Sequence, residues 1–206
     1  MKSQTRHIIF IFLIAALAVG LYANTLSHSF VYDDGKTIKN NNFITSWENL
    51  RHFFDQDYFR YSGESSYRPV TTFSYLVIYS LWGKTPWGFH LSSVLLHAAN
   101  GVLLFLLLVH LLPRMAPSLY NTTGNERHAW LAFLVAVLFV AHPVQTETVN
   151  CVSFNDDLLC TLFFLTSLLL YTLACARRGW RKALLASLSL LGYVVAALAK
   201  ETAFVL

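Results

Sequence analysis

The sequence predicts an all-α integral membrane protein: a polytopic helical bundle of about five transmembrane helices with a large first extracytoplasmic loop. The first observation is composition, because 55% of the 206 residues are hydrophobic and only 13% are charged. About a quarter of the residues of a soluble domain are charged, and a soluble core of this size could not hide so much apolar surface. The second observation is that the apolar residues gather in runs of nearly the length that crosses a bilayer.

The same numbers exclude other classes of protein. The length leaves room for one modest unit rather than a multidomain soluble enzyme, and the low charge excludes a disordered chain. The net charge of +4 comes from scattered bases, so no nucleic-acid partner is expected. The cysteines Cys151, Cys160 and Cys175 form neither a disulfide framework nor a zinc spacing, so the sequence requires no divalent metal and indicates no cofactor.

Five segments come near the roughly 20 residues that a membrane span needs, and the third of them is short. They are His7–Leu26, Trp87–Leu112, Arg127–Ala141, Leu158–Ala176 and Ala183–Ala199. The first segment can also be a signal peptide, because Lys2 and Arg6 precede it and Leu21-Tyr22-Ala23 is a possible cleavage site. Its long apolar run favours an uncleaved anchor, and in either case the residues after it begin outside the cytoplasm.

The basic residues orient the chain in the membrane. With five spans, the basic residues of the N-terminus and the short loops fall on one side, which the positive-inside rule makes cytoplasmic. They are Lys2, Arg6, Arg114, Arg127, Arg177, Arg178, Arg181 and Lys182. Nearly all acidic residues fall on the other side, which indicates a function there. Asn121-Thr122-Thr123 fits the glycosylation pattern but faces the cytoplasm in this topology.

The extracytoplasmic loop Ser27–Pro86 is far longer than a simple connection, and loops of this kind usually carry a binding or catalytic site. Thr45-x-x-Glu48 resembles a capping box for a first surface helix. Val70–Trp82 is apolar but too short to span, with Pro69 suited to the first turn and Gly83 to the end. It is expected to be an interfacial or re-entrant helix, with its aromatic residues Tyr75, Tyr79 and Trp82 at the level of the lipid headgroups.

Paired acids follow the first span. Asp33 and Asp34 lie in Phe30-Val31-Tyr32-Asp33-Asp34-Gly35, and paired carboxylates there can act as a general base or hold a metal. The alternative is a solvated turn in which Gly35 supplies a positive φ angle. A second candidate is His142 with Glu147, followed by Asn155-Asp156-Asp157 before the fourth span, which together indicate a polar pocket at one membrane face. The alternative there is capping of the fourth span by Asn155 or Asp156.

Three further positions are candidates. Arg68 precedes the interfacial helix and can bind a lipid phosphate by bidentate contact, or serve only as a surface anchor. His90 and His97 share one face of the second span, which therefore points inward, and packing is the simpler role for them. Lys200 and Glu201 end the fifth span, either as a local ion pair or with Lys200 binding phosphate.

The order of these motifs resembles the transmembrane and tetratricopeptide-repeat protein O-mannosyltransferases and their bacterial relatives, which have the GT-C fold. The resemblance covers nearly the whole chain. It is carried by Tyr32-Asp33-Asp34, Tyr67-Arg68-Pro69, His97, His142-Pro143-x-x-Thr146-Glu147, Asp157-Leu158-Leu159 and Lys200-Glu201. It implies that residues 1–206 form one membrane-embedded, N-terminal part of such a protein, and that the further spans and repeats of the family are absent from this chain.

The resemblance also implies a function. A sugar would be transferred from a polyprenyl- or dolichyl-phosphate donor to a protein hydroxyl on the extracytoplasmic side, with inversion at the sugar carbon. The membrane would be a bacterial inner membrane or that of the endoplasmic reticulum. By that carry-over Asp33 is the base and Asp34 assists it. The residues expected to bind substrate or lipid phosphate are Arg68, His97, His142, Glu147, Asp157, Lys200 and Glu201. The alternatives are a transporter subunit, which needs no such loop with paired acids, and a non-catalytic membrane scaffold.

Overall fold

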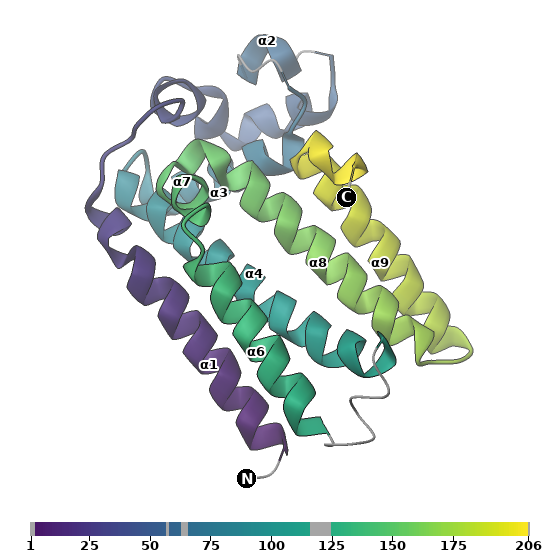
Figure 1. Cartoon of the computed structure of the whole chain (residues 1–206). Coiled ribbons are helices and arrows are strands. Elements are labelled where there is room, and N and C mark those ends of the chain that lie inside the picture. The colour runs from purple at the N-terminus through teal and green to yellow at the C-terminus, as the bar shows by residue number, and fades with distance from the viewer. Residues whose placement is uncertain (1–2, 57, 63–65, 116–124, 206) are drawn as a thin grey trace.

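The computed structural model describes residues 3–56, 58–62, 66–115 and 125–205, and within them every regular element is helical. Five long helices lie side by side and run alternately up and down (Figure 1). They are α1 (Ser3–Tyr22), α4 (Pro86–Met115), α6 (Asn125–Ala141), α8 (Asn155–Cys175) and α9 (Trp180–Ala199). The all-α bundle predicted from composition and hydropathy is confirmed.

The long helices make the chain a multi-pass integral membrane protein. Four segments of the described chain are long and apolar enough to cross a bilayer, and they are Gln4–Ser27, Pro86–Met115, Val152–Cys175 and Trp180–Ala199. The third predicted span is the helix α6, whose 17 residues extend about 26 Å at the usual rise. This is shorter than the roughly 30 Å of a typical hydrocarbon core. The helix nevertheless packs against α1 and α4, which cover its small-residue face.

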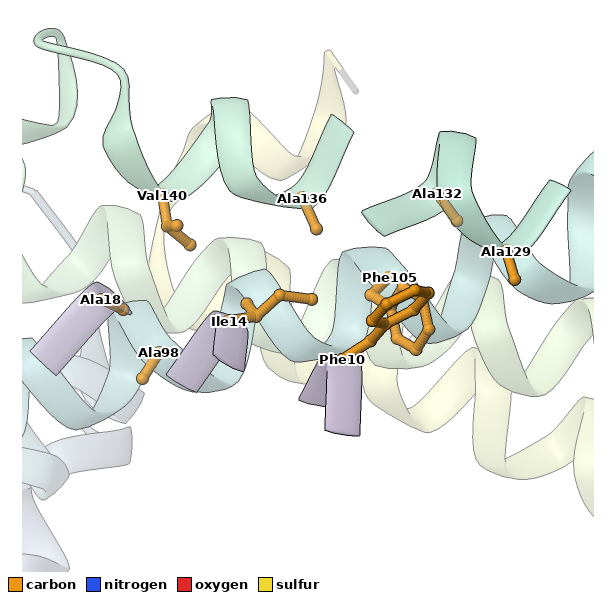
Figure 2. Packing of buried hydrophobic residues seen from close by; sticks show 9 residues of the cluster. All are labelled: Phe10, Ile14, Ala18, Ala98, Phe105, Ala129, Ala132, Ala136 and Val140. Carbon is orange, nitrogen blue, oxygen red and sulfur yellow. The ribbon is translucent and has the colours of Figure 1, made fainter. Parts of the chain in front are cut away.

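Small residues on α6 allow the first three long helices to approach closely. Its buried face consists of Ala129, Ala132, Ala136 and Val140. Figure 2 shows this row lying along Phe10, Ile14 and Ala18 of α1 and Ala98 and Phe105 of α4. Between membrane helices, where lipid is as apolar as the side chains, close packing of small residues supplies much of the association energy.

The same close approach occurs on α4 at Gly101. A Cβ atom at this position would overlap Cγ1 of Val140 and lie 3.0 Å from Cγ2 of Ile14, and both of these side chains are fully buried. The backbone of α4 therefore lies directly against α6 and α1 at this glycine.

We expect Gly101→Ala to destabilise the bundle by about 1–3 kcal/mol, because the added methyl group overpacks the contact between three helices. Thermal unfolding in detergent measures the effect. Gly20→Ala in α1 is the matched control, since a Cβ atom there meets nothing within 4 Å. Equal melting temperatures of the two variants would contradict the packing described.

Helices α8 and α9 form a hairpin joined by reciprocal polar contacts. The hydroxyl of Ser167 donates to the carbonyl of Ser189, and the hydroxyl of Ser189 donates to the carbonyl of Ser167, each at 2.8 Å. The connecting turn carries Arg177 and Arg178 and lies at the end of the bundle where the N-terminus also lies (Figure 1). This grouping agrees with the charge asymmetry on which the predicted orientation rests. The predicted glycosylation motif Asn121-Thr122-Thr123 lies outside the described residues.

The opposite end of the bundle is covered by short helices, which we call the cap (Figure 1). Most of the cap comes from the long loop after α1, and the rest comes from the segment that precedes α8 and the segment that follows α9. Its elements are η1 (Ala23–Ser27), η2 (Gly35–Lys39), η3 (Phe43–Thr45), η4 (Trp47–Phe54), α2 (Tyr58–Ser62), α3 (Pro69–Trp82), α7 (Gln145–Asn150), η5 (Val152–Phe154) and η6 (Glu201–Phe204).

Two expectations for the long loop need correction. The predicted capping box is not formed: Ser46, not Thr45, caps η4 by accepting from the Glu48 N–H at 3.2 Å, because the hydroxyl of Thr45 donates to the carbonyl of Asn42. Helix α3 has the predicted ends, with Pro69 in its first turn and Gly83 at φ 61° after its last. Its Tyr75, however, is only 1% exposed and donates to the carbonyl of Val152 at 2.9 Å, so this ring lies in the protein interior rather than among headgroups.

Candidate functional site

The two neighbouring acids after α1 differ completely in environment. Asp34 is fully buried, and its carboxylate accepts from the Val31 N–H at 3.1 Å and from the Ser153 N–H at 2.7 Å. Cys151 also donates to it at 3.5 Å, and burial raises the pKa of this thiol, which keeps its proton. Asp34 therefore fastens the loop after α1 to the segment that leads into α8.

Asp33 is exposed, because the chain turns sharply just before it. Tyr32 has φ 52°, in the left-handed region that residues other than glycine rarely adopt, and its ring stacks on Phe154. The carbonyl of Asp33 accepts from the N–H groups of Lys36 and Thr37, each at 2.9 Å, which begins η2. No described residue donates a hydrogen bond to the Asp33 carboxylate. Backbone strain of this kind persists where the surroundings fix it, and here the buried Asp34 does so.

Asp33 lines a cleft of about 290 Å³ together with basic residues from three parts of the chain. We call it the charged cleft. Its charged lining residues are Asp33, Lys36, Arg68, Asp156 and Lys200, and its other lining residues include Thr37, Ser66, Thr71, Tyr75, Ser153 and Phe154. The cleft thus places an unshared carboxylate and several cations around one space.

The basic end of the charged cleft is a network of ion pairs. Arg68 donates through Nη1 to Asp156 at 2.5 Å, and through Nε and Nη2 to the two oxygens of Glu201 at 3.1 and 2.7 Å. The Lys200 ammonium lies 2.6 Å from Asp157 and 3.5 Å from Asp156. The predicted local pair between Lys200 and Glu201 is therefore wrong: each of the two residues pairs with a carboxylate or guanidinium from a distant segment.

The remaining predicted residues lie away from this cleft. His97 is fully buried in the bundle, where Nε2 lies 3.1 Å from the carbonyl of Val140 and the ring contacts Tyr22 and Phe139. His90 is also fully buried, so the inward face predicted for both histidines is confirmed. His142 and Glu147 are exposed on the stretch around α7, and the charged cleft does not include them. Of the acidic residues in the predicted polar pocket, Asp156 lines the charged cleft, and Asp157 is connected to it through its pair with Lys200.

Sequence reasoning missed the central carboxylate of the network. Asp156 is expected from the sequence in the polar pocket or at a helix cap, but not among the residues that bind substrate. No side chain caps α8, and Oδ1 of Asp156 instead accepts from the N–H of Asp157 within the first turn. Asn155 does not cap the helix either, since its Oδ1 accepts from Ser93 at 2.7 Å. The sequence did contain a signal for this network, which is the pair of acidic residues at the start of an apolar helix. Carboxylates at the end of a membrane helix need cations from elsewhere in the chain to compensate their charge.

An apolar groove adjoins the charged cleft. It has a volume of about 560 Å³, and Ser66 lines both spaces. Its lining comes mainly from the last turns of α9 and from η6, with Tyr193, Val194, Ala197, Leu198 and Phe204, while Glu201 stands at its edge. A molecule with a charged head and a long apolar tail could therefore occupy the cleft and the groove together.

Comparison with known proteins gives the family. Protein O-mannosyl-transferase TMTC2 of Mus musculus is 34% identical over 171 residues, which are 81% of this chain. Protein O-mannosyl-transferase TMTC4 of Homo sapiens is 34% identical over 77% of the chain, and Tmtc1 of Drosophila melanogaster is 32% identical over 92%. The chain is a homologue of the TMTC protein O-mannosyl-transferases. The resemblance seen in the order of the motifs is confirmed.

The similarity covers only a small part of each relative. The chain spans about a fifth of the length of these TMTC relatives, with 19%, 22% and 21% of TMTC2, TMTC4 and Tmtc1 covered. No protein-family model matches the chain, and no solved structure matches it. The geometry of the cleft, rather than a bound complex, therefore carries the assignment of roles to its residues.

The different environments of the paired acids predict different variant behaviour. We expect Asp34→Ala to lower stability by about 2–4 kcal/mol, because two backbone N–H groups lose their buried acceptor. Asp33→Ala should unfold at nearly the wild-type temperature, because its carboxylate is exposed. Thermal unfolding in detergent tests this pair, and equal losses of stability would contradict the assigned roles.

The pair of Arg68 with Glu201 predicts a pH dependence. The hydrogen bonds from Arg68 lower the pKa of Glu201 from its ordinary 4.5 to about 2. Because the folded state has the lower pKa, the stabilisation is fully present above about pH 4.5 and is lost as the pH falls toward 2. Melting temperatures of the wild type and Glu201→Gln should therefore differ by a constant amount near neutral pH and converge only in strong acid.

The exposed Glu48, which has no ion pair among the described residues, supplies the control variant Glu48→Gln for that titration. Its melting temperature should follow the wild type at every pH. A gap between wild type and Glu201→Gln that closes well above pH 4.5 would show that Arg68 does not hold the Glu201 carboxylate ionised.

Proposed function

We propose that the chain forms the catalytic part of a membrane glycosyltransferase that transfers mannose from a polyprenyl- or dolichyl-phosphate donor to a Ser or Thr hydroxyl of a protein, with inversion, on the extracytoplasmic side. The observation that carries the proposal is the charged cleft, where the unshared Asp33 carboxylate and the cations Arg68 and Lys200 line one space. The relatives' names, protein O-mannosyl-transferase, support the reaction class.

The geometry fits an inverting displacement. The acceptor oxygen forms a bond to the anomeric carbon while the bond from that carbon to the phosphate oxygen breaks. Asp33 takes the proton that the hydroxyl loses, and the lipid phosphate leaves with the electron pair of the broken bond. The transition state resembles an oxocarbenium ion, so a base on one side and positive charge on the other both lower its energy.

The cations are fixed in position before a donor arrives. Arg68 and Lys200 keep 23% and 14% of their side chains exposed, while Asp156 beneath them is almost fully buried. Glu201 is the most exposed carboxylate of the network, at 57%, and it occupies the guanidinium fork of Arg68. Because carboxylate and phosphate present similar pairs of oxygens to arginine, the donor phosphate can replace Glu201 at this position.

The apolar groove fits the donor's lipid. It lies along α9, one of the helices that can cross the membrane, and it adjoins the charged cleft at Ser66. A polyprenyl chain in the groove would place its phosphate beside Arg68 and Lys200 without leaving the bilayer.

A transfer assay in proteoliposomes tests the proposal. With a mannosyl-phosphoryl-polyprenol donor and a threonine-containing peptide, we expect Lys200→Met to raise the KM for the donor about tenfold or more, because a charge-assisted contact to phosphate is lost. Lys200→Arg should restore part of this loss. Lys182→Met, at the opposite end of the bundle, is the matched control and should behave as the wild type.

Two results would contradict the proposal. One is transfer from a nucleotide sugar but from no lipid-phosphate sugar, which would remove the role of the groove and of the two cations. The other is full transfer activity in Asp33→Asn, which would remove the base.

A further inference from the structure

A second and larger cleft lies next to the charged cleft on the cap. Its volume is about 620 Å³, four of its eight lining residues are asparagines, and Lys36 lines both clefts. We call it the asparagine cleft. The lining residues used below are Asn40, Asn42, Asn49, Tyr61 and Lys36. Its size is within the range of about 300–1,000 Å³ that is usual for ligand sites.

The side-chain amides of this cleft have unused hydrogen-bonding groups, and hydrogen bonds hold two of the amides in place. Asn49 donates through Nδ2 to the carbonyl of Phe43 at 3.0 Å, and Oδ1 of Asn42 accepts from Lys84 at 3.3 Å. Among the described residues, Oδ1 of Asn49, Nδ2 of Asn42 and both amide atoms of the exposed Asn40 have no partner. The cleft therefore offers donors and acceptors that are open to a ligand, and those of Asn42 and Asn49 are held in position by the fold.

Tyr61 supplies an aromatic wall. Its ring is stacked on Phe43 at 5.8 Å with an interplanar angle of 16°, and it also contacts the ring of His52 at 4.9 Å. Phe43 is only 3% exposed, whereas 47% of Tyr61 is exposed. The buried ring thus fixes the exposed one, and an aromatic surface held in this way binds a ligand with little loss of side-chain entropy.

The position of the cleft indicates which substrate it takes. In an inverting displacement the nucleophile arrives opposite the leaving group, and the leaving phosphate belongs at the end of the charged cleft with Arg68 and Lys200. Asp33 and Lys36 lie on the same turn, because the Lys36 N–H donates to the Asp33 carbonyl at 2.9 Å. Because Lys36 also lines the asparagine cleft, this cleft adjoins the turn that carries the base.

We propose that the asparagine cleft binds the acceptor polypeptide in an extended form and places its hydroxyl residue beside Asp33. The main chain of such a peptide presents alternating N–H and C=O groups, which match the paired donor and acceptor of an asparagine amide. A peptide side chain packs against Tyr61. This inference rests on the proposed function, since it assigns the acceptor of that same reaction.

Binding of short fluorescein-labelled threonine-containing peptides to the full chain in nanodiscs, followed by fluorescence anisotropy, tests the inference without any transfer step. Tyr61→Ala and Asn40→Ala should each weaken peptide binding about three- to tenfold, as expected for one aromatic contact or one hydrogen-bonding amide. Phe59→Ala on the same helix α2 and the exposed Asn24→Ala are the matched controls, because neither residue lines the cleft. Both should bind as the wild type does.

Steady-state transfer gives the second readout. Tyr61→Ala should raise the KM for the peptide and leave the KM for the donor unchanged, which general unfolding would not do. Wild-type peptide affinity in both Tyr61→Ala and Asn40→Ala would overturn the inference. So would Tyr61-dependent binding of a free manno-oligosaccharide in place of the peptide. Peptide binding with the expected dependence, but with no transfer from any donor, would support the inference and contradict the proposed function.

Discussion

The buried carboxylate of Asp156 is the constraint on which the architecture of the cleft depends. Only 3% of this side chain is exposed, and it lies in the first turn of a membrane helix. A buried charge of this kind is costly unless cations compensate it. Arg68 comes from the cap and Lys200 follows α9, so neutralising Asp156 joins the cap to the ends of α8 and α9. The compensation therefore also brings the two cations to one side of a cleft.

The bundle and its membrane character could be predicted from sequence, because they depend on local properties. Runs of apolar residues determine the long helices, and Pro69 and Gly83 mark the ends of α3 through backbone constraints that act within a few residues. The inward face of His90 and His97 follows from helical periodicity together with the cost of exposing a histidine to lipid. The short α6 was recognised for the same reason, since its apolar run is itself short.

The site could be predicted only in part, because its geometry depends on contacts between distant segments. Nothing local distinguishes Asp33 from Asp34, and the difference arises because the Ser153 N–H, 119 positions further along the chain, reaches Asp34. Likewise, Arg68 pairs with Glu201 across 133 positions, so the sequence neighbours Lys200 and Glu201 form ion pairs with other residues and not with each other. Tyr75 looked like an interfacial aromatic residue because the carbonyl of Val152, its actual partner, is also remote.

Because of these contacts, different residues of the cap have structural and functional roles. Asp34, Tyr75 and Asp156 are buried and hold the short helices on the bundle, while Asp33 remains exposed to the charged cleft. The apolar groove on α9 and the asparagine cleft adjoin the charged cleft through different residues, Ser66 and Lys36. A lipid-linked donor and a polypeptide acceptor could thus approach one carboxylate by separate routes.

Hydrogen–deuterium exchange of Asp156→Ala in nanodiscs tests the central constraint most directly. If the buried carboxylate joins the cap to α8 and α9, exchange should become faster at the start of α3 and in residues 200–204. The α6 segment from Ala129 to Val140, which packs against α1 and α4, should retain its wild-type protection. Unchanged exchange at the start of α3, or an equal increase throughout the bundle, would contradict the account.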